Sequence, residues 1–304
     1  MTTRTHMELK SLALAAALTL LLAGCGGGGG GGSTADRSTV DTPATVPVVA
    51  GVATFSGNRG DYAISAASTG TGYTLTSRSS NQRFNVIGAD NLRFVDMTVN
   101  LGIANKAAVF GQYRTREVIE LYMAFFNRVP DANTLGAWID RMLGGQTLAQ
   151  VAESMYAEAV QEPDATGYSA SMITTEFVLA VYKRVFGLAD ASAPPVADVE
   201  AWSNRIGKGG ISRAAMVLAM LAETRGASGS SSLAMPSVVA LLDNRITTSE
   251  YFAIQHGLSY NTPTESLVKT KEILAAVTAT DFSVARGIIG FTDAAFNLRQ
   301  SGGK

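Results

Sequence analysis

EVIELYMAFFNRVPDANTLGAWIDRMLGGQTLAQVAESMYAEA, from Glu117 to Ala159, is the stretch that decides the fold. Its apolar residues recur three and four positions apart, which predicts helices. Pro130 and the pair Gly144-Gly145 divide the stretch into three helices, because proline and paired glycine both end a helix. The first helix carries one apolar stripe: Val118, Leu121, Tyr122, Phe125 and Phe126. Asp131, Asn133 or Thr134 can cap the second helix and Thr147 the third.

The same pattern returns after Thr175. Tyr182 and Phe186 repeat Tyr122 and Phe126 sixty positions later. The tryptophan, the glycine pair and the cap recur at slightly larger offsets, as Trp202, Gly209-Gly210 and Ser212. The sequence therefore predicts a divergent internal duplication over residues 116–225.

Short alternating apolar runs precede the helices and indicate β-strands. Residues 51–101 contain the runs VATFS, DYAIS, GYTLT, RFNVI and NLRFVDMTVN, separated by Gly, Asn and Asp. We expect four or five strands in a small antiparallel β module that packs on the region C-terminal to it. Asp61, Asp90 and Asp96 are expected to be turn and cap residues rather than ligands.

Helical periodicity resumes in the last part of the chain, residues 235–300. Candidate helices run from Ser237 to His256, from Glu265 to Val277, and over a shorter stretch after Asp281. Together these patterns predict an α+β fold that is mainly α, with a small antiparallel β module followed by a multi-helix region.

Residues 1–25 form a processing signal. Arg4 and Lys10 precede an apolar run from Leu12 to Leu22, which is too short to span a bilayer. Leu22-Ala23-Gly24-Cys25 resembles the lipobox of bacterial lipoproteins, and the resemblance implies that Cys25 is acylated and becomes the mature N-terminus. The alternative is a plain secretory signal. Cys25 is the only cysteine, so no disulfide can form within one molecule.

The position after the cysteine and the tract beyond it bear on localisation. An aspartate directly after the acylated cysteine would resemble an inner-membrane retention signal, but this chain has Gly26 there. We therefore expect an outer-membrane lipoprotein that faces the periplasm or the cell surface. Residues 26–50, a glycine run and then a tract rich in Ser, Thr and Pro, predict a flexible tether.

Composition narrows the function classes. The chain has 304 residues, 46% hydrophobic and 16% charged, which is enough to bury a sizeable core. Its 24 basic and 25 acidic residues leave a formal net charge of −1, so no nucleic-acid partner is expected.

The sequence contains few residues or motifs suited to catalysis. Histidine occurs only at His6, in the leader, and at His256, which rules out multi-histidine metal sites in the mature chain. No phosphate-binding glycine loop follows a strand, and no GxSxG elbow is present. We expect no metal, no cofactor and no enzymatic activity. The alternative is a glycan-acting hydrolase that uses a carboxylate pair on one helix face, Glu117 with Glu120 or Glu158 with Glu162.

Two resemblances add to these patterns. Residues 121–131, Gly136-Ala137-Trp138, Gly144-Gly145 and, later, Asn244-Arg245-Ile246 are similar to the bacterial domain of unknown function 4214. Residues 55–64 and 92–96 resemble the β module that accompanies repeat-in-toxin and related exported proteins, although the calcium-binding nonapeptides are missing. The resemblance to the domain of unknown function 4214 implies an exported, helical, mostly non-catalytic module, with glycan or surface attachment suspected in some members.

One corner of the first helical copy is the candidate binding site. Asn127, Arg128, Pro130 and Asp131 form an Arg-x-Pro-Asp corner that the second copy lacks. A purely structural role competes with ligand binding here, because Arg128 and Asp131 can pair and Pro130 can break a helix. The aromatic residues outside the clearest core stripes are Tyr113, Tyr156, Tyr168 and Tyr260. We expect a membrane-tethered interaction protein that binds a cell-surface glycan or an envelope protein, such as a surface-layer or secretion partner.

Overall fold

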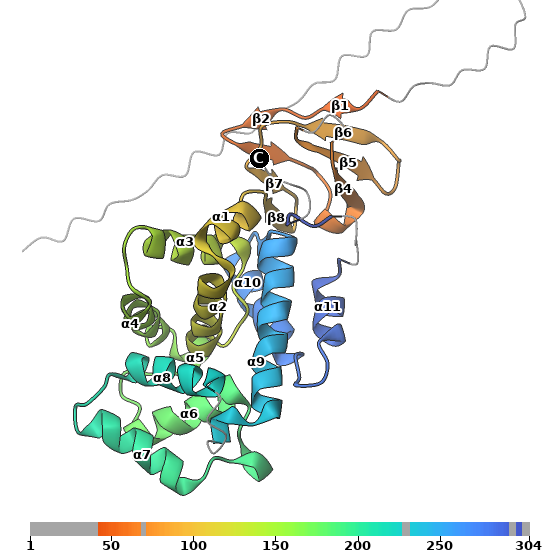
Figure 1. Cartoon of the computed structure of the whole chain (residues 1–304). Coiled ribbons are helices and arrows are strands. Elements are labelled where there is room, and N and C mark those ends of the chain that lie inside the picture. The colour runs from red at the N-terminus through yellow and green to blue at the C-terminus, as the bar shows by residue number, and fades with distance from the viewer. Residues whose placement is uncertain (1–41, 68–70, 227–231, 292–295, 300–304) are drawn as a thin grey trace, which may run out of the picture. The chain divides into compact units, whose positions relative to one another are not determined.

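The computed structural model describes residues 42–67, 71–226, 232–291 and 296–299 (Figure 1). The predicted class, α+β and mainly α, is confirmed. The leader, Cys25 and the glycine run lie outside the described residues. Within those ranges, every helix is too short or too polar to cross a membrane.

The β part consists of two mixed sheets. One sheet has the order β1-β6-β5-β4 and the other β2-β3-β7-β8-β9. The strands are β1 (Ala44–Thr45), β2 (Val48–Val49), β3 (Val52–Thr54), β4 (Tyr62–Ala66), β5 (Tyr73–Ser77), β6 (Arg83–Val86), β7 (Asn91–Arg93), β8 (Met97–Asn100) and β9 (Leu258–Tyr260).

The expectation of one purely antiparallel sheet was therefore wrong. β1 pairs with β6 and β3 pairs with β7 in parallel. Parallel neighbours need a long connection between them, and the excursion through β4, β5 and β6 supplies it for β3 and β7. Alternation still fixes the register, because buried Ile64 lies opposite buried Leu75.

Two strands lie inside the stretch expected to be a tether. β2 and β3 form a hairpin around Ala50 and Gly51, whose φ angles are 49° and 76°. Two central residues with positive φ are the signature of the tight turn that suits hairpins. Within the predicted tether, residues 44–45 and 48–49 thus pair as the strands β1 and β2.

The second sheet is completed from the far end of the sequence. Val99 in β8 pairs with Leu258 in β9. Asn261 then donates from its side-chain amide to the carbonyls of Phe94 at 2.7 Å and Val95 at 3.1 Å. The β module and the C-terminal region therefore share one sheet, a connection that no local pattern indicates.

Helices make up most of the remaining described chain. They are α1 (Ile103–Phe110), α2 (Gln112–Phe126), α3 (Ala132–Leu143), α4 (Leu148–Ala159), α5 (Pro163–Thr166), α6 (Thr174–Phe186), α7 (Val196–Gly207), α8 (Arg213–Arg225), α9 (Pro236–Ser249), α10 (Pro263–Ala275) and α11 (Ser283–Ile289). A π-helical segment, Glu250–Gln255, continues α9. The helical region begins with α1 at Ile103 and not at residue 116. Gly111, with φ 102°, separates α1 from α2.

Helix α2 is the centre of the helical region. It contacts α1, α3, α4, α6, α8 and α9, and Figure 1 shows it between these helices. All nine residues from Val118 to Phe126 are buried, so the predicted single apolar stripe was too narrow. Among them is one charged residue, Glu120. A helix surrounded by other helices buries its whole circumference rather than one face.

The order α2-α3-α4 recurs as α6-α7-α8, with matching details. Thr147 Oγ1 accepts a hydrogen bond from the backbone N–H of Gln150 to cap α4, and Ser212 Oγ accepts one from the backbone N–H of Ala215 to cap α8. The guanidinium carbon of Arg141 lies 4.0 Å from the Trp138 ring, and that of Arg205 lies 4.3 Å from the Trp202 ring. The packing differs, because α2 packs closely on α4 whereas α6 packs closely on α7.

Candidate functional site

The Arg-x-Pro-Asp corner begins where α2 ends. Asn127 adopts the left-handed conformation, φ 52° and ψ 39°, and its N–H donates to Met123 O. This cap ends the helix three residues before Pro130, which is buried. The Val129 N–H then donates to Thr270 O at 3.2 Å and so attaches the corner to α10.

Asp131 joins three elements. Its Oδ1 accepts from the Thr134 N–H at 2.8 Å, which caps α3 as predicted, and from Ser259 Oγ at 3.3 Å. Its Oδ2 accepts from Ser266 Oγ at 3.3 Å. The carboxylate therefore holds α3, β9 and α10 together.

Arg128 bonds to Tyr122 and not to Asp131, the partner that the spacing also allowed. Its Nε donates to Tyr122 Oη at 2.9 Å, and its guanidinium carbon lies 5.7 Å from the Phe126 ring centre. Burial raises the pKa of Tyr122 to about 12, so the phenol is neutral at physiological pH. A neutral phenol that accepts from Arg128 still has its own proton to donate.

These residues line a groove of about 700 Å³. The corner forms one wall, residues 161–165 a second and residues 260–267 a third. We call this the corner groove; its named lining residues here are Tyr122, Arg128, Asp131, Glu162, Tyr260 and Ser266. A hollow of this size matches small-molecule sites, which run from about 300 to 1,000 Å³.

Tyr260 supplies a rigid aromatic surface to the groove. It is half-buried, and its ring stacks on Phe252 at 5.8 Å between centroids with 29° between planes. Burial raises its pKa to about 12 as well. The groove thus combines two neutral phenols, one guanidinium and carboxylates that include exposed Glu162.

The structure places the four predicted corner residues in different positions. Arg128 and Asp131 line the groove, and Pro130 is buried. Asn127 instead lines a smaller cavity of about 260 Å³ beside Arg245. The third wall, residues 260–267, was missed except for Tyr260, because nothing local places it beside a corner some 130 positions earlier.

The four aromatic candidates have different environments. Tyr113 is 75% exposed, and Tyr260 lines the corner groove. Tyr156 is half-buried and accepts from Arg213 at 3.0 Å. Tyr168 is a core residue: it is fully buried and donates to Ala124 O at 3.0 Å.

In each predicted carboxylate pair, one glutamate forms an ion pair with an arginine. Burial raises the pKa of both Glu117 and Glu120, which line one pocket. Glu120 forms an ion pair with Arg225. Glu158 pairs with Arg141 at 3.1 Å. Asp61 and Asp96 accept backbone N–H groups, from Asn58 and Arg59, as turn residues do.

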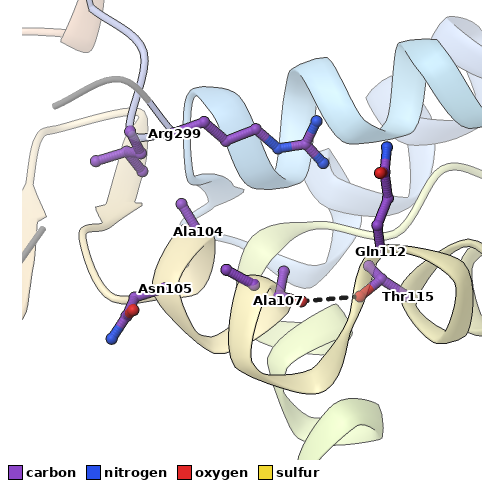
Figure 2. Close-up of a pocket in the computed structure, with 8 residues that line it drawn as sticks. Ala104, Asn105, Ala107, Gln112, Thr115 and Arg299 are labelled. Carbon is purple, nitrogen blue, oxygen red and sulfur yellow. Dashed lines mark hydrogen bonds between the residues drawn. The ribbon is translucent and has the colours of Figure 1, made fainter. Parts of the chain in front are cut away.

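A further pocket of about 430 Å³ lies beside α1 (Figure 2). In Figure 2 the side chains of Arg299 and Gln112 extend on one side of this helix and Asn105 on the other. Arg299 pairs with buried Glu250 at 3.2 Å, and Arg116 pairs with the same carboxylate at 3.3 Å. The pocket therefore borders an ion-pair cluster at the start of the π-helical segment.

His256 is 3% exposed and lies among the rings of Tyr251, Phe291 and Phe296, which places it in a core and not at a surface site. Within the described ranges, no three His, Cys, Asp or Glu side chains gather as a metal site requires. No family model, curated protein or solved structure matches this chain.

Proposed function

We propose that the protein is a non-enzymatic interaction protein of the bacterial envelope, held to the outer membrane through acylated Cys25, which binds a surface glycan in the corner groove. The observation that carries this proposal is the groove itself, in which Tyr260, from a distant part of the sequence, lies in one hollow with Tyr122 and Arg128.

The chemistry of the groove suits a sugar. A pyranose ring presents an apolar C–H face and several hydroxyl groups, so it is recognised by a rigid aromatic ring and by fixed polar groups. Tyr260 provides such a ring. The guanidinium of Arg128, fixed by Tyr122, provides N–H donors in a planar fork.

The acidic residues around the groove favour a neutral or amino sugar over an acidic one. Arg128 is a single positive charge, whereas Asp131, Glu162 and Asp164 are three carboxylates on the same lining. A uronic acid or a phosphorylated sugar would meet repulsion from this lining.

We propose binding without hydrolysis because one carboxylate of each helical pair is in an ion pair with an arginine. Arg225 holds Glu120 and Arg141 holds Glu158, so neither pair offers two carboxylates free for acid and nucleophile roles. Incubation with envelope glycans, followed by reducing-end analysis, tests this directly. Release of new reducing ends that Glu117→Gln abolishes would contradict it.

The test of the proposed function is a glycan array with a matched pair of variants. Arg128→Gln removes the guanidinium that lines the groove, and Arg205→Gln removes one that covers Trp202 in the second copy. We expect the wild type and Arg205→Gln to retain the same glycans, and Arg128→Gln to bind them about tenfold more weakly. If no glycan is retained but crosslinking captures one envelope protein through the groove, the ligand class is wrong.

A further inference from the structure

A second pocket, of about 680 Å³, lies between α2, α4 and α8. Its lining is mostly apolar and includes Leu121, Leu148, Leu218 and Ala222. Leu218 and Leu148 are only half-buried, so apolar surface is open to solvent inside the pocket. Tyr113, 75% exposed, stands among the lining residues.

The polar groups of this α2–α8 pocket carry a negative charge. Its lining holds two carboxylates, Glu117 and Glu120, against one guanidinium, Arg225. Arg225 binds Glu120 and also donates to Asp243 at 2.6 Å, so its positive charge is already matched twice. Glu117, half-buried, interacts with Tyr113 and with Arg114, which itself stacks on Phe110 at 4.3 Å.

We propose that the α2–α8 pocket binds a cationic amphiphile, with the aliphatic chain against Leu121, Leu148 and Leu218 and the ammonium group beside Glu117. The apolar lining gains free energy when it covers a chain, at about 0.8 kcal/mol per buried CH2 group. The surplus carboxylate selects the sign of the head group, because an anionic head would meet Glu117 and Glu120 without a free guanidinium. This ligand differs in class from the glycan of the corner groove, and the two sites are independent.

Isothermal titration of the purified protein with three ten-carbon probes tests the proposal. The probes are decyltrimethylammonium, decyl sulfate and decyl maltoside, each below its micellar concentration. We expect decyltrimethylammonium to bind at least about tenfold more tightly than decyl sulfate, since charge selects the head group. Equal affinity for the two charged probes would overturn the proposal.

Two pairs of variants locate the site. Ala222→Trp fills the pocket, and Ala201→Trp places the same side chain at an exposed position of α7. Glu117→Gln removes the charge, and Glu200→Gln removes one from α7. We expect Ala222→Trp to abolish binding of decyltrimethylammonium and Glu117→Gln to weaken it about fivefold, with both controls unchanged.

Glu117→Gln tests whether the ammonium group binds beside Glu117 even if Ala222→Trp does not fold. Unchanged affinity in a folded Glu117→Gln variant would place the cation elsewhere and refute the assignment. The unfolding midpoint of each variant, measured without probe, shows that it is folded.

Discussion

Arg128 Nε donates a 2.9 Å hydrogen bond to Tyr122 Oη across the turn that ends α2. The bond joins a buried helical residue to the only guanidinium that lines the corner groove in the described part of the chain. It fixes a long, otherwise mobile side chain at the site, which reduces the conformational entropy lost on binding. The corner is thus organised for recognition by a bond that the two copies do not share.

Tyr122→Phe should therefore weaken ligand binding without removing any residue of the core. The lost hydrogen bond should lower the free energy of unfolding by about 1 kcal/mol, and freeing Arg128 should weaken glycan binding several-fold. Tyr182→Phe, the equivalent change in the second copy, should leave binding unchanged. Unchanged binding in Tyr122→Phe, or an equal loss in both variants, measured by calorimetric titration, would contradict a specific role for the Tyr122–Arg128 bond.

Asn127 should tolerate glycine but not valine. Its φ of 52° lies in the left-handed region, where a β-branched residue is strained by about 1–2 kcal/mol. Asn127→Val should lower the free energy of unfolding by that amount in urea denaturation, whereas Asn127→Gly should leave it close to that of the wild type, because glycine adopts the left-handed conformation without strain. The same loss in both variants would mean that the side-chain amide, and not the backbone angle, is what the corner requires.

Glu120 should make stability depend on pH in a defined direction. Burial raises its pKa above the ordinary value of 4.5, while the ion pair with Arg225 acts in the opposite direction. The folded state therefore holds the proton more tightly than the unfolded state does. Its contribution to stability is complete below pH 4.5 and declines as the pH rises through the higher native pKa.

Comparison with Glu120→Gln isolates this effect. The unfolding free energy of the wild type minus that of Glu120→Gln should fall as the pH rises through the window above 4.5. A difference that grows with pH for Glu120→Gln would mean that the Arg225 pairing outweighs burial.

Cys25→Ser should release the protein from membranes. Acyl chains contribute about 0.8 kcal/mol per buried CH2 group, and more than one chain is needed for stable anchoring. In cell fractionation, the wild type should sediment with outer membranes and Cys25→Ser should stay in the soluble fraction. A variant that still sediments entirely with membranes would show that another contact holds the protein there.

Local patterns predicted the elements well because local physics determines them. The caps at Asp131 and Thr147 and the burial of Trp138 all follow from residue types within a few positions. The alternation around Ile64 likewise predicted its strand.

What sequence could not provide is the set of partners that lie far apart in the chain. The spacing allowed Arg128 to pair with Asp131, three positions away, but in the folded chain Arg128 Nε donates to Tyr122 Oη. Asp131 binds Ser259 and Ser266, more than a hundred positions later. Only the folded chain shows that the corner and residues 260–267 form one groove.

The most direct measurement is the mapping of amide and side-chain NMR shifts in Cys25→Ser protein as an array-selected glycan is added. We expect saturable shifts to gather at the corner groove, on Arg128 Nε and on the amides of Asp131 and Tyr260. In Arg128→Gln the amide shifts should need about tenfold more glycan. Shifts confined to another surface, or none at glycan concentrations that saturate the array signal, would contradict glycan binding in the corner groove.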